Sequence, residues 1–249
     1  MSKELIHIKK GNVPSVIHSS CHMFCNIDED NSLVSFRVTN AAAVVLEIVN
    51  LLDNQNTVNF NGDIIIDDNC ELKIVIVDFA SSSVNFNINS TINNNSRITV
   101  DLATVSSSNQ KKIFDIKVKQ LGLNSYSYVK MSGVSDGKTT LSLLGTTDIV
   151  KGAKKSFTCQ EGTIVNLSDE GKTQVSPILK IAENDIKASH SAKLGKVSDD
   201  IMFYLMSRGL NRREASSLLT VSYLKPVIEQ ISVKEYQTHL LNYIEKRDF

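Results

Sequence analysis

The sequence predicts a mainly β protein, a β-solenoid followed by a small C-terminal α-helical domain. Three observations support this fold class. Apolar and polar residues alternate from about residue 32 to residue 180, the connections are rich in Asn, Asp, Ser and Gly, and the period becomes helical beyond Lys196. Alternation over four to seven residues is typical of a strand with one buried face.

The choice among all-β architectures depends on the connections. Short strands at spacings of roughly 10 to 14 residues fit a sandwich, a barrel or a solenoid. Abundant Asn favours the solenoid because amides on stacked turns can form ladders, and two-residue hairpin signals are scarce. No exact repeat of fixed period is visible. Residues 40–52 fit a short helix or buried strand, and the Val and Ile content favours strand.

The helical period beyond Lys196 comes with clear start and stop signals. Ser198 is a good N-cap, and Arg208-Gly209 is a suitable stop. Two capping boxes follow, Asn211 with Glu214 and Ser232 with Glu235, and Pro226 is expected to break or kink the helix that crosses it. The sequence therefore divides into a short N-terminal segment (1–30), the solenoid (31–196) and the helical domain (197–249).

Composition excludes several classes of protein. The 249 residues contain 27 Lys+Arg and 27 Asp+Glu, and this balance argues against nucleic acid as the main partner. No run of 18 apolar residues predicts a membrane span, and the first residues lack the apolar stretch of a secretory signal. Four cysteines in such a chain are expected to be reduced, which predicts a cytoplasmic protein.

Few residues suggest chemistry by themselves. The sequence has no glycine-rich phosphate loop, no GxSxG and no HExxH. The compact group His18, Cys21, His22 and Cys25 has ligand types of zinc, but no second ligand pair follows at a finger-like distance. His190, expected between the end of a strand (179–186) and the first helix, is the most interesting titratable group. Cys159, as a lone cysteine, is expected to pack in a turn of the solenoid.

From about Lys130 to Leu219 the sequence resembles the SufB/SufD family, the scaffold proteins of the Suf iron–sulfur cluster assembly system, and is closer to SufD. The resemblance rests on short segments spread over this region. They are GVSDGK (133–138), LSD (167–169), PILKI (177–181), DIKASH (185–190), Gly195, FYLMSRGL (203–210) and Glu214-Ala215.

The resemblance implies a right-handed parallel β-helix with a C-terminal helical domain, and a scaffold rather than an enzyme. Family members pair through the end of the β-helix, and their C-terminal helices bind the SufC ATPase. A SufB cysteine and a SufD histidine at the shared interface are the implied ligands of the nascent iron–sulfur cluster. His190 falls on that histidine position, and its neighbours Ser189 and Ser191 look like SufD, because SufB-type chains carry glutamates there.

The same resemblance marks further candidate residues. Alignment of the segment around Gln160 puts Glu161 at the SufB cysteine position, with Cys159 two residues away, so both join His190 as candidates for cluster assembly. The candidate contacts to SufC are Phe203, Tyr204, Arg208, Gly209 and Leu210. The implied partners are a SufB-like protein, or a second copy of this chain in its absence, and SufC.

Two other interpretations stay open at this point. A β-helix enzyme or binding protein acting on carbohydrate would need clustered carboxylates and exposed aromatic residues, yet only 6% of the chain is aromatic and Trp is absent. A structural solenoid without any site is the third interpretation.

Overall fold

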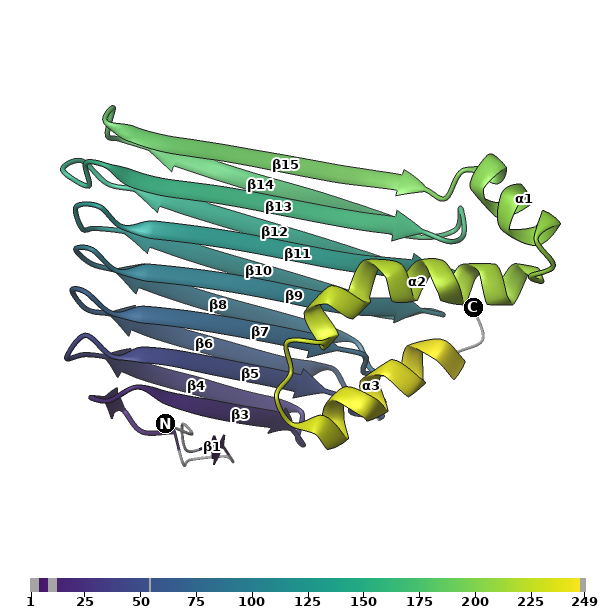
Figure 1. Cartoon of the computed structure of the whole chain (residues 1–249), viewed down its shortest axis with the longest axis horizontal. Coiled ribbons are helices and arrows are strands. Elements are labelled where there is room, and N and C mark those ends of the chain that lie inside the picture. The colour runs from purple at the N-terminus through teal and green to yellow at the C-terminus, as the bar shows by residue number, and fades with distance from the viewer. Residues whose placement is uncertain (1–4, 9–12, 54, 247–249) are drawn as a thin grey trace.

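The computed structural model describes residues 5–8, 13–53 and 55–246, which form a parallel β-solenoid followed by three helices (Figure 1). The predicted fold class is confirmed. Among these residues, successive strands alternate between two sheets, and all pairs are parallel. The odd sheet contains β1 (Leu5–Ile8), β3 (Cys21–Ile27), β5 (Ala43–Asn50), β7 (Glu71–Asp78), β9 (Arg97–Ser107), β11 (Tyr126–Asp136), β13 (Ser156–Asn166) and β15 (Ile186–Lys196). The even sheet contains β2 (Val16–Ile17), β4 (Asn31–Val38), β6 (Val58–Ile66), β8 (Val84–Ile92), β10 (Lys111–Gln120), β12 (Thr140–Ile149) and β14 (Lys172–Ile181).

The N-terminal region contributes strands to both sheets. The segment at residues 40–52, expected as strand, forms β5. Strand β3 lies within the first 30 residues and pairs in parallel with β5, so part of the segment set apart at 1–30 adds to the odd sheet. Residues 1–4 and 9–12 of that segment lie outside the described residues.

Apolar side chains from both sheets fill the interior of the solenoid. The inward positions alternate with half-buried or exposed ones, as in β6 and β8. Phe60, Phe86 and Phe114 come from successive strands of the even sheet. The rings of Phe60 and Phe86 stack with centroids 4.3 Å apart, and the ring of Phe114 is tilted against Phe86 at 5.6 Å. Each turn therefore buries its apolar face against the turns above and below it, as expected for a solenoid.

Asparagine ladders join successive turns, as the sequence predicted. The amide of Asn85 donates to Asn59 at 3.0 Å on the outer side of the even sheet. At a corner, Asn69, Asn95 and Asn124 all have positive φ, and their side chains are linked by hydrogen bonds of 3.2 Å and 3.1 Å. Asn tolerates this left-handed conformation better than most residues, so it can end each strand and bind the next turn at once.

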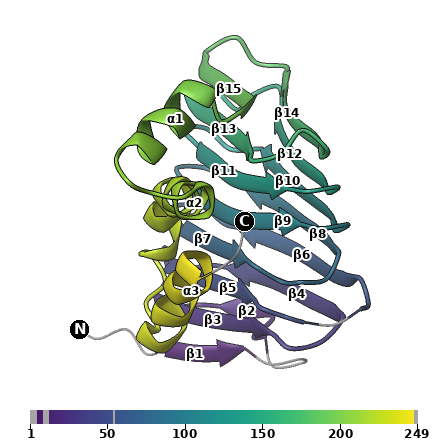
Figure 2. The same cartoon turned by 90° about the vertical axis from the view of Figure 1, so that its right-hand side faces the viewer.

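The helices α1 (Asp199–Ser207), α2 (Arg212–Ile228) and α3 (Lys234–Lys246) lie on the side of the odd sheet (Figure 2). Ser198 caps α1, Gly209 follows it with φ +99°, and Asn211 and Glu214 form the predicted capping box of α2. Helices α2 and α3 bury a second apolar layer against the outer face of the odd sheet. Its members include Val75, Val77, Val105, Leu224, Ile228 and Leu240.

Pro226 lies inside α2, which continues past it and ends two residues later at Ile228. One detail of the helices differs from the prediction. Ser232 does not open a capping box, because α3 begins at Lys234 and Ser232 binds the solenoid instead. Its N–H and hydroxyl both donate to the buried Glu47 carboxylate (2.9–3.1 Å), which also contacts His22 Nε2 at 2.6 Å. We call Glu47, His22 and Ser232 the Glu47 anchor, since they fasten the α2–α3 turn to the solenoid.

Candidate functional site

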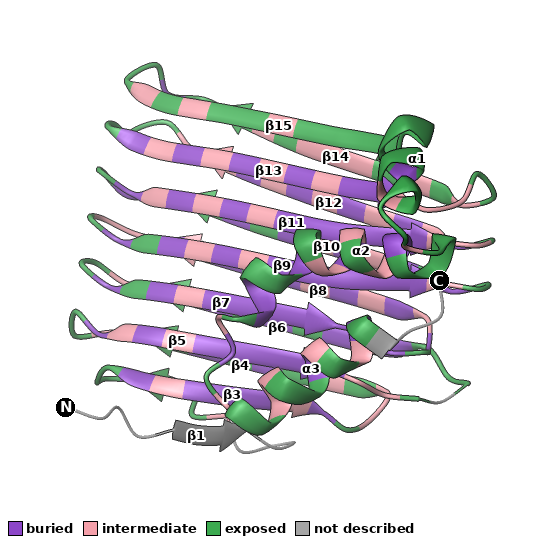
Figure 3. Cartoon of the chain, turned by 45° about the vertical axis from the view of Figure 1, so that its right-hand side comes forward, coloured by how far each residue is buried: buried purple, intermediate pink, exposed green. Residues whose placement is uncertain are grey.

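His190 lies in the middle of β15, the last strand of the odd sheet. The sequence placed it after a strand at 179–186, and this prediction was wrong. Strand β14 ends at Ile181, a turn follows, and β15 continues beyond His190 to Lys196. No further strand covers β15 in the described residues, so most of its residues are exposed (Figure 3). Apolar and polar residues alternate only weakly along such a strand.

The register of β15 shows which way His190 faces. His190 pairs with Gln160 of β13, and in-register neighbours in a parallel sheet share a face. Gln160 is 1% exposed, and its side-chain amide is hydrogen-bonded at 2.6 Å to the hydroxyl of Thr147 on the opposite sheet. The amide oxygen accepts from Thr147, and the nitrogen donates to the Gly145 carbonyl. His190 therefore lies on the interior side of the last turn, where it is exposed.

Cys159 and Glu161 lie on the opposite, outer side of the same sheet. Their Sγ and Oε1 atoms are 4.0 Å apart, and they are in register with Ser189 and Ser191 rather than with His190. Burial, together with the Glu161 carboxylate, raises the pKa of the neighbouring Tyr128 to about 12. The structure thus brings Cys159 and Glu161 together but separates both from His190 within one chain.

The N-terminal histidines and cysteines do not form one site. Cys21 and Cys25 belong to the apolar interior, whereas His22 contacts Glu47 on the outer side. Burial, with a smaller contribution from Asp28, raises the pKa of Cys25 to about 11, which disfavours the thiolate that binds metals. Within the described part of the chain, no group of three or more His, Cys, Asp and Glu side chains is placed to hold a metal ion.

The last turn of the solenoid leaves two strand edges uncovered. We call β14 and β15 the end rung, since each is the last strand of its sheet in the described residues. Apolar side chains remain partly exposed there, with Ile181 48% and Leu194 51% exposed. Unpaired backbone groups beside apolar side chains are a template for a further strand.

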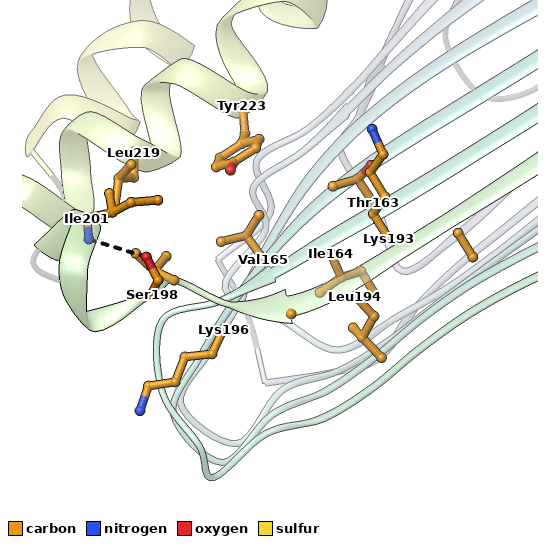
Figure 4. A pocket seen from close by; sticks show the side chains of 13 residues that line it. Thr163, Ile164, Val165, Lys193, Leu194, Lys196, Ser198, Ile201, Leu219 and Tyr223 are labelled. Carbon is orange, nitrogen blue, oxygen red and sulfur yellow. Dashed lines mark hydrogen bonds between the residues drawn. The ribbon is translucent and has the colours of Figure 1, made fainter.

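A groove separates the end of β15 from α1 and α2 (Figure 4). It has a volume of about 630 Å³, and Val165, Leu194, Ile201, Leu219 and Tyr223 are among its lining residues. The chain between β15 and α1 consists of Val197 and Ser198 alone, and the backbone N–H of Ile201 donates to the Ser198 hydroxyl at 3.3 Å. The strand that carries His190 is therefore connected almost directly to α1.

Helix α1 packs through one face and exposes the other. Met202 is its buried residue, whereas Phe203 is 75% and Tyr204 56% exposed. The Arg208 guanidinium lies 5.2 Å from the centroid of the Tyr204 ring, and Leu210 is half-buried beyond the exposed Gly209. All five residues that the sequence marked as partner contacts thus lie on α1 or just beyond its C-terminal end.

Sequence reasoning missed Gln160 and Tyr128 as neighbours of the candidate residues. Gln160 is the neighbour of His190 on β13, and Tyr128 is the neighbour of Cys159 on β11, in the preceding turn. Both neighbours follow from the pairing register between strands about 30 residues apart. Alternation of apolar and polar residues within one strand does not show which residue of the next strand lies beside it.

Comparison with known proteins gives the family. The model of the family described as "SUF system FeS cluster assembly, SufBD core domain" matches residues 2–223, which is most of the chain. The chain belongs to the SufBD family. The family's description names iron–sulfur cluster assembly, which favours this interpretation over a carbohydrate-binding solenoid.

Curated members of the SufBD family match parts of the chain. The iron–sulfur cluster assembly protein SufD of Bacillus subtilis is 30% identical over 138 residues, 55% of this chain and 32% of that protein. A SufBD family protein of Mycobacterium bovis is 29% identical over 129 residues, 52% of this chain and 15% of its own length. The chain thus spans about a third or less of the length of these relatives. None of the helices in its described residues combines the length and apolar character needed to cross a membrane.

Proposed function

We propose that this chain acts as the SufD-type scaffold subunit of an iron–sulfur cluster assembly complex, without catalysis of its own. The cluster is cargo that is assembled on the complex and passed on. The observation that carries the proposal is the position of His190, whose imidazole lies exposed on the interior side of the end rung. In this proposal residues 31–196 form the scaffold domain and residues 197–249 the ATPase-binding domain.

His190 would offer a neutral imidazole nitrogen to iron, a ligand type that suits this metal. The remaining ligands would come from the partner, since Cys159 and Glu161 lie on the other side of the sheet. We treat Cys159 and Glu161 as a second, separate candidate position. A Cys159→Ser variant that keeps cluster assembly would remove Cys159 from the candidate ligands, and a Glu161→Gln variant that keeps it would remove Glu161.

The end rung would pair with a SufB-like protein. Its two uncovered strand edges and its partly exposed Ile181 and Leu194 support this assignment. A partner strand added there would hydrogen-bond to the edge and bury the apolar side chains in one step. His190 would then lie between the two proteins, where a cluster bridging them could be built.

Helix α1 would bind the SufC ATPase. Its exposed Phe203 and Tyr204 are aromatic residues of the kind enriched at protein interfaces. The inner faces of α2 and α3 are less suited to binding SufC, because these faces already pack on the odd sheet. For the same reason the full chain, rather than a helical fragment, is the material for binding experiments.

Replacement of His190 tests the cluster site. His190→Ala is expected to abolish cluster assembly in cells, read as the activity of an iron–sulfur enzyme, while the complex keeps its stoichiometry. His190→Cys, which retains an iron ligand, should restore part of the activity. Ser189→Ala is the matched control, since its side chain is adjacent but faces the outer side. Normal assembly in His190→Ala would refute the site.

Replacement of Phe203 and Tyr204 tests the ATPase interface. The Phe203→Ala/Tyr204→Ala variant of the full chain should lose capture of the SufC ATPase, because hot-spot aromatic residues contribute about 2 kcal/mol or more each. Leu33→Ala is the control, since Leu33 is 65% exposed on β4 of the other sheet. Undiminished capture by the double variant would show that SufC binds elsewhere.

A further inference from the structure

The neutral overall charge of the chain conceals a strong separation of charge along the solenoid. Between residues 20 and 109 the sequence contains eleven acidic and three basic residues. Between residues 110 and 196 it contains fourteen lysines and eight acidic residues. Because strands stack in sequence order, the early turns are acidic and the late turns are basic.

The end rung is the basic extreme of this gradient. Its two strands contain five lysines and no acidic residue. Lys196 binds Asp169 at 2.7 Å. The other four are exposed, and none forms an ion pair with a described carboxylate within 4.0 Å; they are Lys172, Lys180, Lys187 and Lys193.

The acidic residues of the last turn lie outside these strands. Glu183, in the turn between β14 and β15, is buried, and its carboxylate accepts from the backbone N–H groups of Gly152, Asn184 and Asp185. These hydrogen bonds lower the pKa of Glu183, so it stays ionised and bound to the turn. The four lysines thus flank the uncovered edges and the partly exposed Ile181 and Leu194.

We infer that the end rung is built to pair with the end rung of a different solenoid whose outer positions are acidic, and that its lysines oppose pairing with a second copy. In a two-fold pair each surface meets its own copy, so the four lysines of one chain would face those of the other. Like charges at an interface suppress the wrong partner, whereas opposite charges steer the right one. This inference rests on the proposed pairing through the end rung and specifies the charge of the partner.

A charge-reversed copy of this chain supplies a defined acidic partner. Lys172, Lys180, Lys187 and Lys193 are replaced by Glu, and the variant is mixed with the wild-type chain. Sedimentation velocity should show each protein alone as a monomer and the mixture as a dimer at about 0.05 M salt. At about 0.5 M salt, charges are screened beyond a few ångströms. The association constant of the mixture should then be lower by about tenfold.

A matched control separates local from general electrostatics. It reverses four exposed lysines away from the end rung, Lys111, Lys117, Lys119 and Lys138, and it should not associate with the wild type. If the quadruple variant is not folded by circular dichroism, Lys187→Glu/Lys193→Glu is used instead. A salt-insensitive dimer of the wild type alone, or a mixture that stays monomeric at low salt, would overturn the inference. The test leaves His190 unchanged, so its result is independent of the cluster site.

Discussion

The buried ion pair between Lys112 and Asp78 allows a quantitative prediction. Lys112 Nζ lies 2.7 Å from Asp78 Oδ2, and both side chains are 0% exposed. Asp78 also accepts hydrogen bonds from Asn50 and Thr104, and Lys112 donates to the Ala80 carbonyl at 2.8 Å. The pair therefore links four strands of the solenoid, β5, β7, β9 and β10.

Lys112→Met keeps most of the apolar stem and removes the ammonium group. The variant leaves the Asp78 carboxylate buried without its counter-charge, which should lower the free energy of unfolding by about 3–5 kcal/mol. In Lys112→Met/Asp78→Asn the buried charge is also gone, while an amide remains for Asn50 and Thr104. The double variant should therefore recover most of the loss.

The same strand provides the control. Lys117 Nζ lies 2.7 Å from Asp115 Oδ2, but these side chains are 50% and 20% exposed. Lys117→Met should cost less than about 1 kcal/mol, because solvent screens this pair. Urea unfolding with linear extrapolation measures all three variants. Equal losses for Lys112→Met and Lys117→Met, or a double variant no more stable than Lys112→Met, would refute the reasoning.

Three further predictions concern the outer face of the odd sheet. The pKa of Tyr128, raised to about 12, exceeds the usual value of about 10 in the unfolded chain, so stability should fall as pH rises between them. Glu161→Gln removes one cause of the raised pKa of Tyr128, so the pH range over which stability falls should become narrower. Urea unfolding at a series of pH values measures this range, and an unchanged range would contradict the role of Glu161. Cys159 is the only cysteine that is not buried, so iodoacetamide should label it before the other three, as mass spectrometry would show; equal labelling would argue against this packing. Ser232→Ala removes one hydrogen bond to the Glu47 carboxylate, worth about 1.5–3 kcal/mol, and should accelerate hydrogen exchange in α3 roughly tenfold to a hundredfold. Unchanged exchange would show that the apolar layer alone holds α3.

The sequence predicted the strands well because burial in a solenoid repeats within each strand. Alternation in β6 and β8 corresponds to inward and outward side chains, and the ladder of Asn69, Asn95 and Asn124 at the corner follows from turn chemistry. The repeat itself was invisible, since its length varies along the chain. Asn59 and Asn85 in adjacent turns are 26 residues apart, whereas Ser127 and Thr158 are 31 apart. Such variation in turn length removes any fixed period from the sequence.

The orientation of the candidate site could not be predicted, because it depends on register between strands. The sequence located His190 and Cys159 but did not show that they face opposite sides of one sheet, which follows from the pairing of His190 with Gln160. The role of Ser232 was missed for a similar reason. Its partner Glu47 is 185 residues away, and a local capping motif predicted a different use of the same hydroxyl.

The attachment of the helices suggests how a partner on α1 could act on His190. Helices α2 and α3 are held by the Glu47 anchor and by the apolar layer on the odd sheet, whereas α1 buries Met202 alone among its residues. Beside α1 lies an open groove, and only Val197 and Ser198 separate it from β15. A force on α1 is therefore expected to move β15, which has no strand beyond it in the described residues, before it disturbs the early turns. If so, binding of the proposed ATPase partner will change hydrogen exchange in β15 while β3 to β9 stay unchanged. Exchange changes spread equally over the whole odd sheet would show that the anchored helices transmit the force instead.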